Sequence, residues 1–263
     1  MRIGFFQYCP EHKNPEANLT KVCKALSGVQ ADLMVLPELC LTGYSFSSRA
    51  ELTRFSQPVP DGEFCQVFLS LCRERRINLV FGMAEKAGNR IYNSAVLITT
   101  GGAVHSYRKA HLFWDEKELF DPGDSPFPVF TLGDVRIGML VCFDHIYPEA
   151  ARSLALQGAQ IISHPSNLIL EIAQLTTTVR AIENRVYWIL ANRTGEEQQG
   201  SRRLTFTGQS QIVAPDGRLL CRAGPDSEEV VILEIDPAAA LNKFVTPKND
   251  LFADRRPELY FGQ

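Results

Sequence analysis

The chain has 263 residues, of which 45% are hydrophobic and 22% charged, so it can bury a large core and still form one α/β domain. Its formal net charge of −3 gives no electrostatic reason to bind nucleic acid or a membrane surface. We therefore predict a single domain over residues 1–263 and exclude nucleic acid and membranes as partners.

The first half of the chain predicts buried strands that alternate with helices. Short apolar runs suited to buried strands lie at residues 2–7, 31–36 and 78–84. Helical patterns begin after Asn14 and after Gly62. Two further runs, residues 91–99 and 103–107, flank Gly101 and Gly102. A glycine pair predicts a hairpin there, because glycine tolerates the positive φ that such turns need.

The second half repeats this order from Arg136-Ile137-Gly138, which matches Arg2-Ile3-Gly4. In both halves the second strand ends in proline, at Pro37 and Pro165. The elements predicted here are an apolar strand at 135–141, a helix at 148–156, a strand from 159, a helix at 170–185, a strand at 187–192 and a closing hairpin over 208–221. Two such units predict two mixed sheets that face each other with helices outside, a four-layer α-β-β-α sandwich of the α/β class.

Three residues that could perform chemistry each follow a predicted strand: Glu38, Lys109 and Cys142. The ends of the strands are expected to converge on one cleft. Cys142 stands at a strand-to-helix elbow, which we expect to present the thiol and to leave the following backbone N–H groups unpaired. Taken singly, each residue has a structural explanation, as a core thiol, a helix-starting carboxylate or a surface charge. Together they supply a nucleophile, a base and a cation for an anionic oxygen.

Five ordered motifs make the chain resemble the nitrilase superfamily, the carbon-nitrogen hydrolases, along essentially its whole length. They are LPELxLTGY around Glu38, YRKxHLF around Lys109, GxxVCxDxxYPE around Cys142, RAIENR at 180–185 and RRPELY near the C-terminus. Members of this family have a glutamate, a lysine and a cysteine in this chain order, and their fold is the α-β-β-α sandwich. The resemblance therefore agrees with the fold that the internal repeat predicts.

The resemblance implies a role for each of these residues. Glu38 would be the general base, Cys142 the nucleophile, and Lys109 the group that stabilises the tetrahedral intermediate, with the backbone N–H of Phe143 completing the oxyanion hole. Glu116, in EKELFDPGD, matches a fourth family residue better than Glu118 does and would orient Lys109 and the substrate amide. The reaction would pass through a thioester and release ammonia or an amine, with no metal and no organic cofactor.

Two other catalytic functions and one non-catalytic function remain as alternatives. A metal-dependent phosphoesterase on a similar sandwich would use residues of the kinds found at Asp144, His145, His164, Asn167 and Asn192. The sequence has no compact metal-ligand motif that would support this function, and the hypothesis leaves Glu38, Lys109 and Cys142 without a role. A histidine could instead pair with Cys142, but the glycines usual at such elbows are missing. A binding or scaffold protein would be expected to lack at least one of the three residues.

The segment after the nucleophile narrows the substrate. Relatives that act on substrates with a free carboxylate often have an arginine two or three residues after the cysteine, where this chain has Asp144, His145 and Ile146. We therefore predict a small neutral amide as substrate, with a small aliphatic nitrile or an N-carbamoyl compound as alternatives. Residues expected to line the pocket are Tyr44, Phe113, Trp114, His145 and Asn167. The role of His145 is not assigned.

Location and assembly can also be predicted. Seven scattered cysteines without a Cys-x-x-Cys pair fit a reducing compartment and argue against structural zinc. The first ten residues lack the apolar region of a signal peptide, so we expect a cytoplasmic protein. The polar tail at about 243–263 has four apolar anchors, Leu251, Phe252, Leu259 and Tyr260. The family resemblance implies that this tail lies at the interface of a homodimer or larger homo-oligomer.

Overall fold

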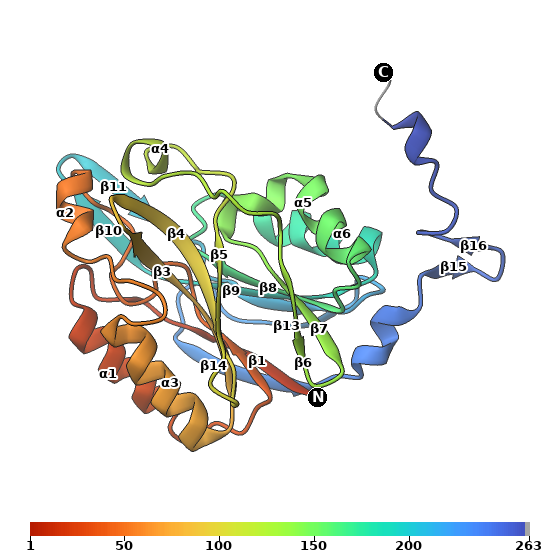
Figure 1. The fold of residues 1–263 in the computed structure, drawn as a ribbon, viewed down its shortest axis with the longest axis horizontal. Helices are drawn as coiled ribbons and strands as arrows, with labels where there is room; N and C mark the ends of the chain where they lie inside the picture. Colours follow the sequence, from red (N-terminus) through yellow and green to blue (C-terminus); the bar gives the residue numbers. More distant parts are fainter. Residues whose placement is uncertain (261–263) are drawn as a thin grey trace.

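Two six-stranded mixed sheets form the centre of the molecule in the computed structural model, which describes residues 1–260 (Figure 1). The first sheet contains, in spatial order, β14 (Glu229–Glu234), β1 (Arg2–Gln7), β2 (Leu33–Val35), β3 (Asn78–Ala87), β4 (Arg90–Ile98) and β5 (Val104–Arg108). The second contains β13 (Leu219–Arg222), β12 (Gln211–Val213), β9 (Tyr187–Asn192), β8 (Ile161–Ser166), β7 (Val135–Met139) and β6 (Val129–Leu132).

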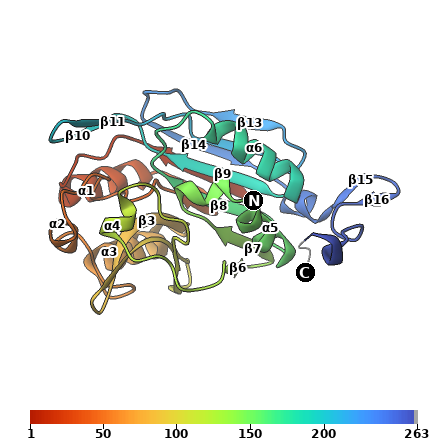
Figure 2. The ribbon, with the colours of Figure 1, turned by 90° about the horizontal axis from the view of Figure 1, so that it is seen from above.

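Four longer helices cover the outer faces of the sheets, as Figures 1 and 2 show. They are α1 (Pro15–Leu26) and α3 (Glu63–Arg75) on the first sheet, and α5 (Pro148–Leu156) and α6 (Ala173–Asn184) on the second. Asn14 caps α1 by accepting a hydrogen bond from the backbone N–H of Ala17, and Pro15 occupies the first helical turn, where its missing N–H costs nothing. The arrangement confirms the predicted α-β-β-α sandwich.

Side chains alternate between the two faces of the first sheet and so belong to different parts of the core. Val35 and Val80 lie in one continuous cluster with residues of the second sheet such as Ile162. Their neighbours Met34 and Phe81 point the other way, into a cluster with apolar residues of α1 and α3. The two sheets therefore share an apolar interface, and the loops at one end of it carry the candidate site.

The internal repeat is present, but the halves are closed by strands that the sequence analysis did not predict. β6 pairs antiparallel with β7, and β14 pairs antiparallel with β1, with Arg2 opposite Glu234. The last long strand of the chain thus belongs to the sheet of the first half. Predicted boundaries also shift: the strand from 135 ends at Met139, and the helix expected over 170–185 is Ala173–Asn184.

Smaller elements complete the chain. They are α2 (Arg49–Thr53), α4 (Glu116–Leu119), the hairpin β10 (Glu196–Gln199) and β11 (Arg202–Thr205), and the pair β15 (Phe244–Thr246) and β16 (Asn249–Asp250). The C-terminal segment from β15 onward reaches out from the two sheets (Figure 1). Its Phe252 ring lies 4.9 Å from the guanidinium carbon of Arg152 and 4.8 Å from Nζ of Lys243. Of the predicted interface at 243–263, residues 261–263 lie outside the described residues. Within residues 1–260, no helix is long and apolar enough to cross a membrane.

Candidate active site

Glu38, Lys109 and Glu116 meet in one buried cluster. Glu38 follows β2 and Lys109 follows β5, while Glu116 begins the short helix α4. The Lys109 Nζ lies 2.9 Å from Oε1 of Glu38 and 2.8 Å from the carboxylate of Glu116. The side chains of Glu38 and Lys109 are completely buried, and that of Glu116 is 2% exposed. One ammonium group is therefore shared by two carboxylates away from water, whereas Glu118, the other candidate, is exposed.

The two carboxylates determine the charge state of Lys109. Burial by itself would lower the pKa of Lys109, but the negative charges of Glu116 and Glu38 outweigh it and raise that pKa above its usual value. Burial also raises the pKa of Glu116, partly offset by the ion pair with Lys109 and by a hydrogen bond from Tyr44. Lys109 is thus a permanent cation in this site.

The backbone around Glu38 is held against β3 at a close approach. The N–H of Cys40 donates to the Gly82 carbonyl at 3.0 Å, and the N–H of Gly82 donates to the Pro37 carbonyl at 3.0 Å. A Cβ at position 82 would lie 2.4 Å from Cα of Glu38, so only glycine fits there. Oε1 of Glu38 also accepts a 2.6 Å hydrogen bond from Nδ2 of Asn93.

The second oxygen of the same carboxylate is unpaired. Within the part of the chain that the structure describes, Oε2 of Glu38 is buried and has no hydrogen-bond partner. Buried polar atoms are usually paired, so an unpaired one at a cluster of charges calls for an explanation, of which a catalytic role is one. This oxygen can accept a proton while Oε1 stays fixed by Lys109 and Asn93.

Cys142 occupies a strained elbow between β7 and a 3-10 helix, Cys142–Ile146. Its φ is +44°, a conformation that costs a non-glycine residue free energy and is concentrated at functional sites. Asp144 stabilises the elbow, because its Oδ2 accepts hydrogen bonds from the N–H of Val141 at 3.0 Å and from the Tyr107 hydroxyl at 2.8 Å. Phe143 lies in the first turn, where its N–H has no partner within the 3-10 helix.

The expectation that the elbow presents its thiol to solvent is wrong. Cys142 is only 5% exposed, and it shares a narrow pocket with Phe113 and with residues of the loop after β8. Burial raises the pKa of the thiol well above its ordinary value, and the charge of Glu38 raises it further, whereas Lys109 and the backbone N–H of Asn167 act in the opposite direction. The thiol is therefore protonated at neutral pH and must transfer its proton to act as a nucleophile.

Two buried histidines near Cys142 are neutral. The Nε1–H of Trp188 donates to Nδ1 of His164 at 3.2 Å, so the ring proton of His164 is on Nε2, which donates to the Cys142 carbonyl at 2.8 Å. His145 contacts the Thr176 hydroxyl through Nδ1 at 2.7 Å, and burial together with the nearby Arg180 lowers its pKa to about 4. Both rings support the elbow rather than carry charge into the site.

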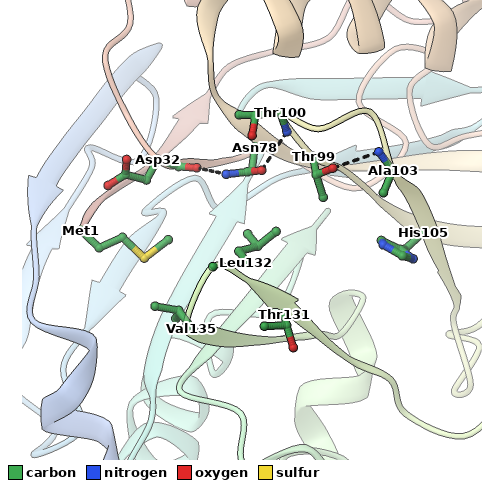
Figure 3. A pocket seen from close by; sticks show the side chains of 11 residues that line it. Met1, Asp32, Asn78, Thr99, Thr100, Ala103, His105, Thr131, Leu132 and Val135 are labelled. Carbon is green, nitrogen blue, oxygen red and sulfur yellow. Dashed lines mark hydrogen bonds between the residues drawn. The ribbon is translucent and has the colours of Figure 1, made fainter.

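The pocket beside Cys142 is narrow and mainly apolar, with a free volume of about 20 Å³. Besides Cys142 it is lined by Phe113, Phe143, His145, Ile146, Asn167, Leu168, Ile169, Leu170 and Ile172. A roomier hollow of about 480 Å³, drawn in Figure 3, lies elsewhere. It is formed by Asp32, Asn78 and Val135, which stand at the opposite ends of the strands from Glu38 and Cys142. The small pocket is therefore the candidate active site, because it contains Cys142, the predicted nucleophile.

The predicted pocket residues divide into two groups. Phe113, His145 and Asn167 line the pocket at Cys142. Tyr44 and Trp114 instead border a neighbouring hollow that also includes Glu116. Tyr44 donates its hydroxyl hydrogen to Glu116 at 2.7 Å, whereas the Trp114 ring is 57% exposed and lies 4.9 Å from the guanidinium carbon of Arg202. Trp114 thus lies outside the pocket at Cys142.

Sequence reasoning missed two residues that shape the site. Asn93 binds Glu38 from β4, and Gly82 allows the close approach of the Glu38 backbone. A glycine within an apolar strand, such as Gly82, is a recognisable signal of a close contact, but nothing local marks Asn93. The alternative metal site has no geometric support: among residues 1–260 no group of three or more His, Cys, Asp or Glu side chains is arranged to hold a metal ion.

Comparisons with known proteins place the chain in a family. Residues 2–241 match the family model for carbon-nitrogen hydrolases. A nitrilase of Pyrococcus abyssi is 42% identical over 264 residues, which cover 99% of both chains. An (R)-stereoselective amidase of a Pseudomonas species is 34% identical over 97% of this chain and 92% of its own length.

One similar solved structure is an amidase of Nesterenkonia sp. AN1, in a mutant that carries the acetamide moiety of fluoroacetamide on its active-site cysteine. Its TM-score is 0.80 at 27% identity, and the match covers 98% of this chain and 95% of that one. The likeness therefore extends to both sheets and to the loops around the site. From the family match and these relatives together, we conclude that this chain belongs to the carbon-nitrogen hydrolase family.

Proposed function

We propose that this protein hydrolyses the carbon–nitrogen bond of small neutral amides through a thioester on Cys142. The observation that carries the proposal is the fully buried Lys109 ammonium, which Glu38 and Glu116 share beside the strained elbow of Cys142. A permanent cation at this position can hold the oxygen that becomes negative when a thiol attacks a carbonyl carbon. Acyl transfer is the chemistry that uses all of these groups together.

In the first half of the reaction, the Cys142 sulfur attacks the amide carbonyl carbon. Oε2 of Glu38 accepts the thiol proton as the S–C bond forms, which the raised pKa of the thiol makes necessary. Lys109 and the Phe143 N–H hold the negative oxygen of the tetrahedral intermediate. The C–N bond then breaks, and protonated Glu38 supplies the proton with which ammonia or an amine leaves.

In the second half, water hydrolyses the thioester. Glu38 is ionised again and accepts a proton from the attacking water, and the same oxyanion contacts are formed a second time. The C–S bond breaks, the sulfur regains a proton from Glu38, and the carboxylic acid is released. Glu116 keeps Lys109 in place through both halves, which is the positioning role that we propose for it.

The lining of the pocket supports a neutral substrate. Its side chains are mainly apolar, and His145 is uncharged at neutral pH because its pKa is about 4. The nearby Arg180 donates to the carbonyl oxygens of His145 and Ile146, so its guanidinium is engaged with backbone rather than available to a substrate carboxylate. An N-carbamoyl amino acid therefore fits less well than a neutral amide.

Asn167 offers the polar contact that an amide needs. Its side chain is 3% exposed, and within residues 1–260 neither Nδ2 nor Oδ1 has a hydrogen-bond partner. Burying an amide group with both polar atoms unpaired is energetically unfavourable, and a bound partner removes this cost. We propose that it binds the carboxamide of the substrate next to Cys142. The pocket of about 20 Å³ favours short acyl groups.

Nitrile hydrolysis is the second candidate function. The relative that is 42% identical is a nitrilase, and the same nucleophile and cation would act on a nitrile carbon. A nitrile has no amide N–H for Asn167 Oδ1 to accept, so this hypothesis leaves part of the pocket unused. For this reason we place amides first.

We also propose that the protein forms a homodimer through α6. Leu175, Val179 and Ile182 lie on one face of this helix at spacings of four and three residues and are 68%, 42% and 43% exposed. Such a stripe is a typical protein–protein contact surface, and the C-terminal segment lies against the neighbouring α5. The seven cysteines are all unpaired, which fits the proposed cytoplasmic location.

An ammonia-release screen of small amides, nitriles and N-carbamoyl compounds tests the proposal, with Cys142→Ala as the blank. We expect release from short neutral amides, none from the variant, and an acyl adduct on Cys142 when a quenched reaction is analysed by intact-mass spectrometry. Release that survives in Cys142→Ala, or that a chelator abolishes in the wild type, would contradict the mechanism. Faster release from nitriles than from the matching amides would favour the second candidate.

A further inference from the structure

A second buried ion pair lies outside the catalytic cluster and close to it in the fold. The carboxylate of Glu197, at the start of the β10–β11 hairpin, binds Nη1 of Arg193, and both side chains are completely buried. A buried pair of charges is costly unless further hydrogen bonds satisfy it. The same carboxylate accepts hydrogen bonds from two backbone N–H groups. The nitrogen of Tyr44 lies 3.0 Å from each of its oxygens, and that of Ser45 lies 2.7 Å from Oε2.

The loop that carries Tyr44 is fitted closely to this carboxylate. Gly43 has a φ of +78°, and a Cβ there would lie 2.6 Å from Oε1 of Glu197. His12 closes the other side, with Nε2 3.7 Å from Oε2 of Glu197 and 2.6 Å from the Ser45 carbonyl oxygen. The position of the loop backbone at residues 43–45 therefore depends directly on where the carboxylate stands.

The aromatic rings beside the pair add a second contact to the same loop. The guanidinium carbon of Arg193 lies 4.0 Å from the centre of the Phe206 ring, and this ring meets the Tyr44 ring edge-on at 6.1 Å between centroids. Arg193 thus holds Glu197 on one side and supports the ring of Tyr44 on the other.

Tyr44 transmits this arrangement to the catalytic cluster. Its hydroxyl donates to Oε1 of Glu116 at 2.7 Å, and the same oxygen lies 2.8 Å from Nζ of Lys109. We propose that Glu197 is a positioning residue of the active site, which through Tyr44 fixes the carboxylate of Glu116 and thereby the ammonium of Lys109. This inference rests on the proposed function, because it assigns Lys109 and Glu116 their roles there.

A positioning role has a consequence for pH dependence. The titratable groups that face Glu116 are Lys109, Glu38, Tyr44 and the thiol of Cys142. Burial raises the pKa of Glu116, and the hydroxyl of Tyr44 opposes this by donating to the charged form. If Tyr44 moves away, the pKa of Glu116 rises further and the carboxylate becomes protonated at a higher pH. The acid limb of kcat should then move to higher pH.

The test compares three single variants, one double variant and one control variant. Glu197→Asp keeps the charge next to Arg193 but draws the carboxylate back from the loop, and Tyr44→Phe removes only the hydroxyl. Glu197→Gln is a second variant at this position, to be measured if Glu197→Asp does not fold. Glu196→Asp is the matched control, because Glu196 is on the same strand but pairs with Arg203 at the surface.

We expect Glu197→Asp and Tyr44→Phe each to lower kcat by about tenfold or more with little change in KM, and to move the acid limb upward together. The double variant Glu197→Asp/Tyr44→Phe should be no slower than the worse single variant, since both changes act through one contact. Glu196→Asp should behave like the wild type. An unmoved acid limb in Glu197→Asp, or effects that multiply in the double variant, would show that Glu197 has only a structural role.

A separate readout distinguishes failure of this inference from failure of the proposed function. If the wild type hydrolyses no amide or nitrile, the rate at which iodoacetamide alkylates Cys142 can still be followed against pH by peptide mass spectrometry. The charge of Glu116 is one of the causes of the raised pKa of this thiol. Because both variants displace the charge of Glu116 relative to the thiol, Glu197→Asp and Tyr44→Phe should both move the pH midpoint of alkylation, in the same direction and by a similar amount. Midpoints equal to that of the wild type would overturn the inference.

Discussion

Lys109 and Glu38 form an ion pair in which neither side chain is exposed, with Nζ 2.9 Å from Oε1. The pair lies in a region of low dielectric, where removing one charge leaves the other uncompensated. The ammonium is also shared with Glu116, so a single substitution at position 109 leaves two buried carboxylates facing each other. The cluster that we propose for catalysis therefore also affects stability.

Lys109→Met should reduce kcat for amide hydrolysis by about a thousandfold, because it removes the cation that we propose for the oxyanion. Lys109→Arg should not restore the rate, since a planar guanidinium does not fit where a compact ammonium is completely buried. Steady-state ammonia release measures both. Lys117→Met, an exposed lysine in the same segment, is the control, and a rate loss in Lys109→Met no larger than in this control would rule out the proposed role.

Gly82→Ala should lower both stability and activity. The new methyl group would lie 2.4 Å from Cα of Glu38 and 2.7 Å from the backbone nitrogen of Leu39, so β3 and the Glu38 segment must move apart. Over-packing of this kind costs about 1–3 kcal/mol. Urea unfolding and kcat measure the two effects. Gly28→Ala, which meets nothing within 4 Å, should leave kcat unchanged, and equal kcat values for the two variants would contradict the argument.

The stability of the protein should fall between about pH 6.5 and pH 4 in part because of His145. Burial and Arg180 lower its pKa from 6.5 to about 4, so the folded state binds this proton less readily than the unfolded chain. The contribution of neutral His145 is complete above the unfolded pKa and is lost as the pH falls toward the folded one. A shift of this size corresponds to roughly 3 kcal/mol.

His145→Asn should make the free energy of unfolding less dependent on pH in that window, because the variant has no ring to protonate. The amide of asparagine can still meet the Thr176 hydroxyl, which preserves the local hydrogen bond. Urea unfolding of both proteins at several pH values isolates the effect. Parallel curves for wild type and variant would show that His145 does not titrate in this way.

Leu175→Asp should shift the protein from a dimer to a monomer. A charge at the most exposed point of the α6 stripe would have to be buried in the proposed interface. Light scattering should give about twice 29.4 kDa for the wild type and a value near 29.4 kDa for the variant. Leu219→Asp, at an exposed leucine of β13, is the control. A wild type that is monomeric at all concentrations would contradict the dimer.

The parts of the fold that the sequence predicts are those with local causes. Strands such as Arg2–Gln7 are short apolar runs bounded by polar residues, and helices such as Pro15–Leu26 begin at a capping asparagine and a proline. The internal repeat then places the ends of equivalent strands together. For this reason Glu38, Lys109 and Cys142 can be singled out before any coordinates are known, although their roles stay predictions.

What the sequence does not show depends on contacts between distant segments. Asn93 lies in a strand whose register against β3 decides whether its amide reaches Glu38. The thiol of Cys142 shares its pocket with residues that follow β8, about twenty-five positions later in the chain. The local elbow alone would leave this thiol exposed, and only the distant segment shows that it is buried. The proposed role of Glu197 also depends on a distant segment, because its carboxylate binds a loop more than 150 residues earlier in the chain.

The pairing of β1 with β14 has a consequence for how the protein is made. Arg2 finds its strand partner only at Glu234, 232 positions later, and the terminal ammonium of Met1 donates to the Ile235 carbonyl at 2.9 Å. Until the ribosome has released that last strand, one side of β1 is an unpaired edge, able to pair with other nascent chains. Contacts this distant in sequence also slow folding. The first sheet is thus completed only after residue 234 has been translated, and a chain truncated before β14 should aggregate rather than fold.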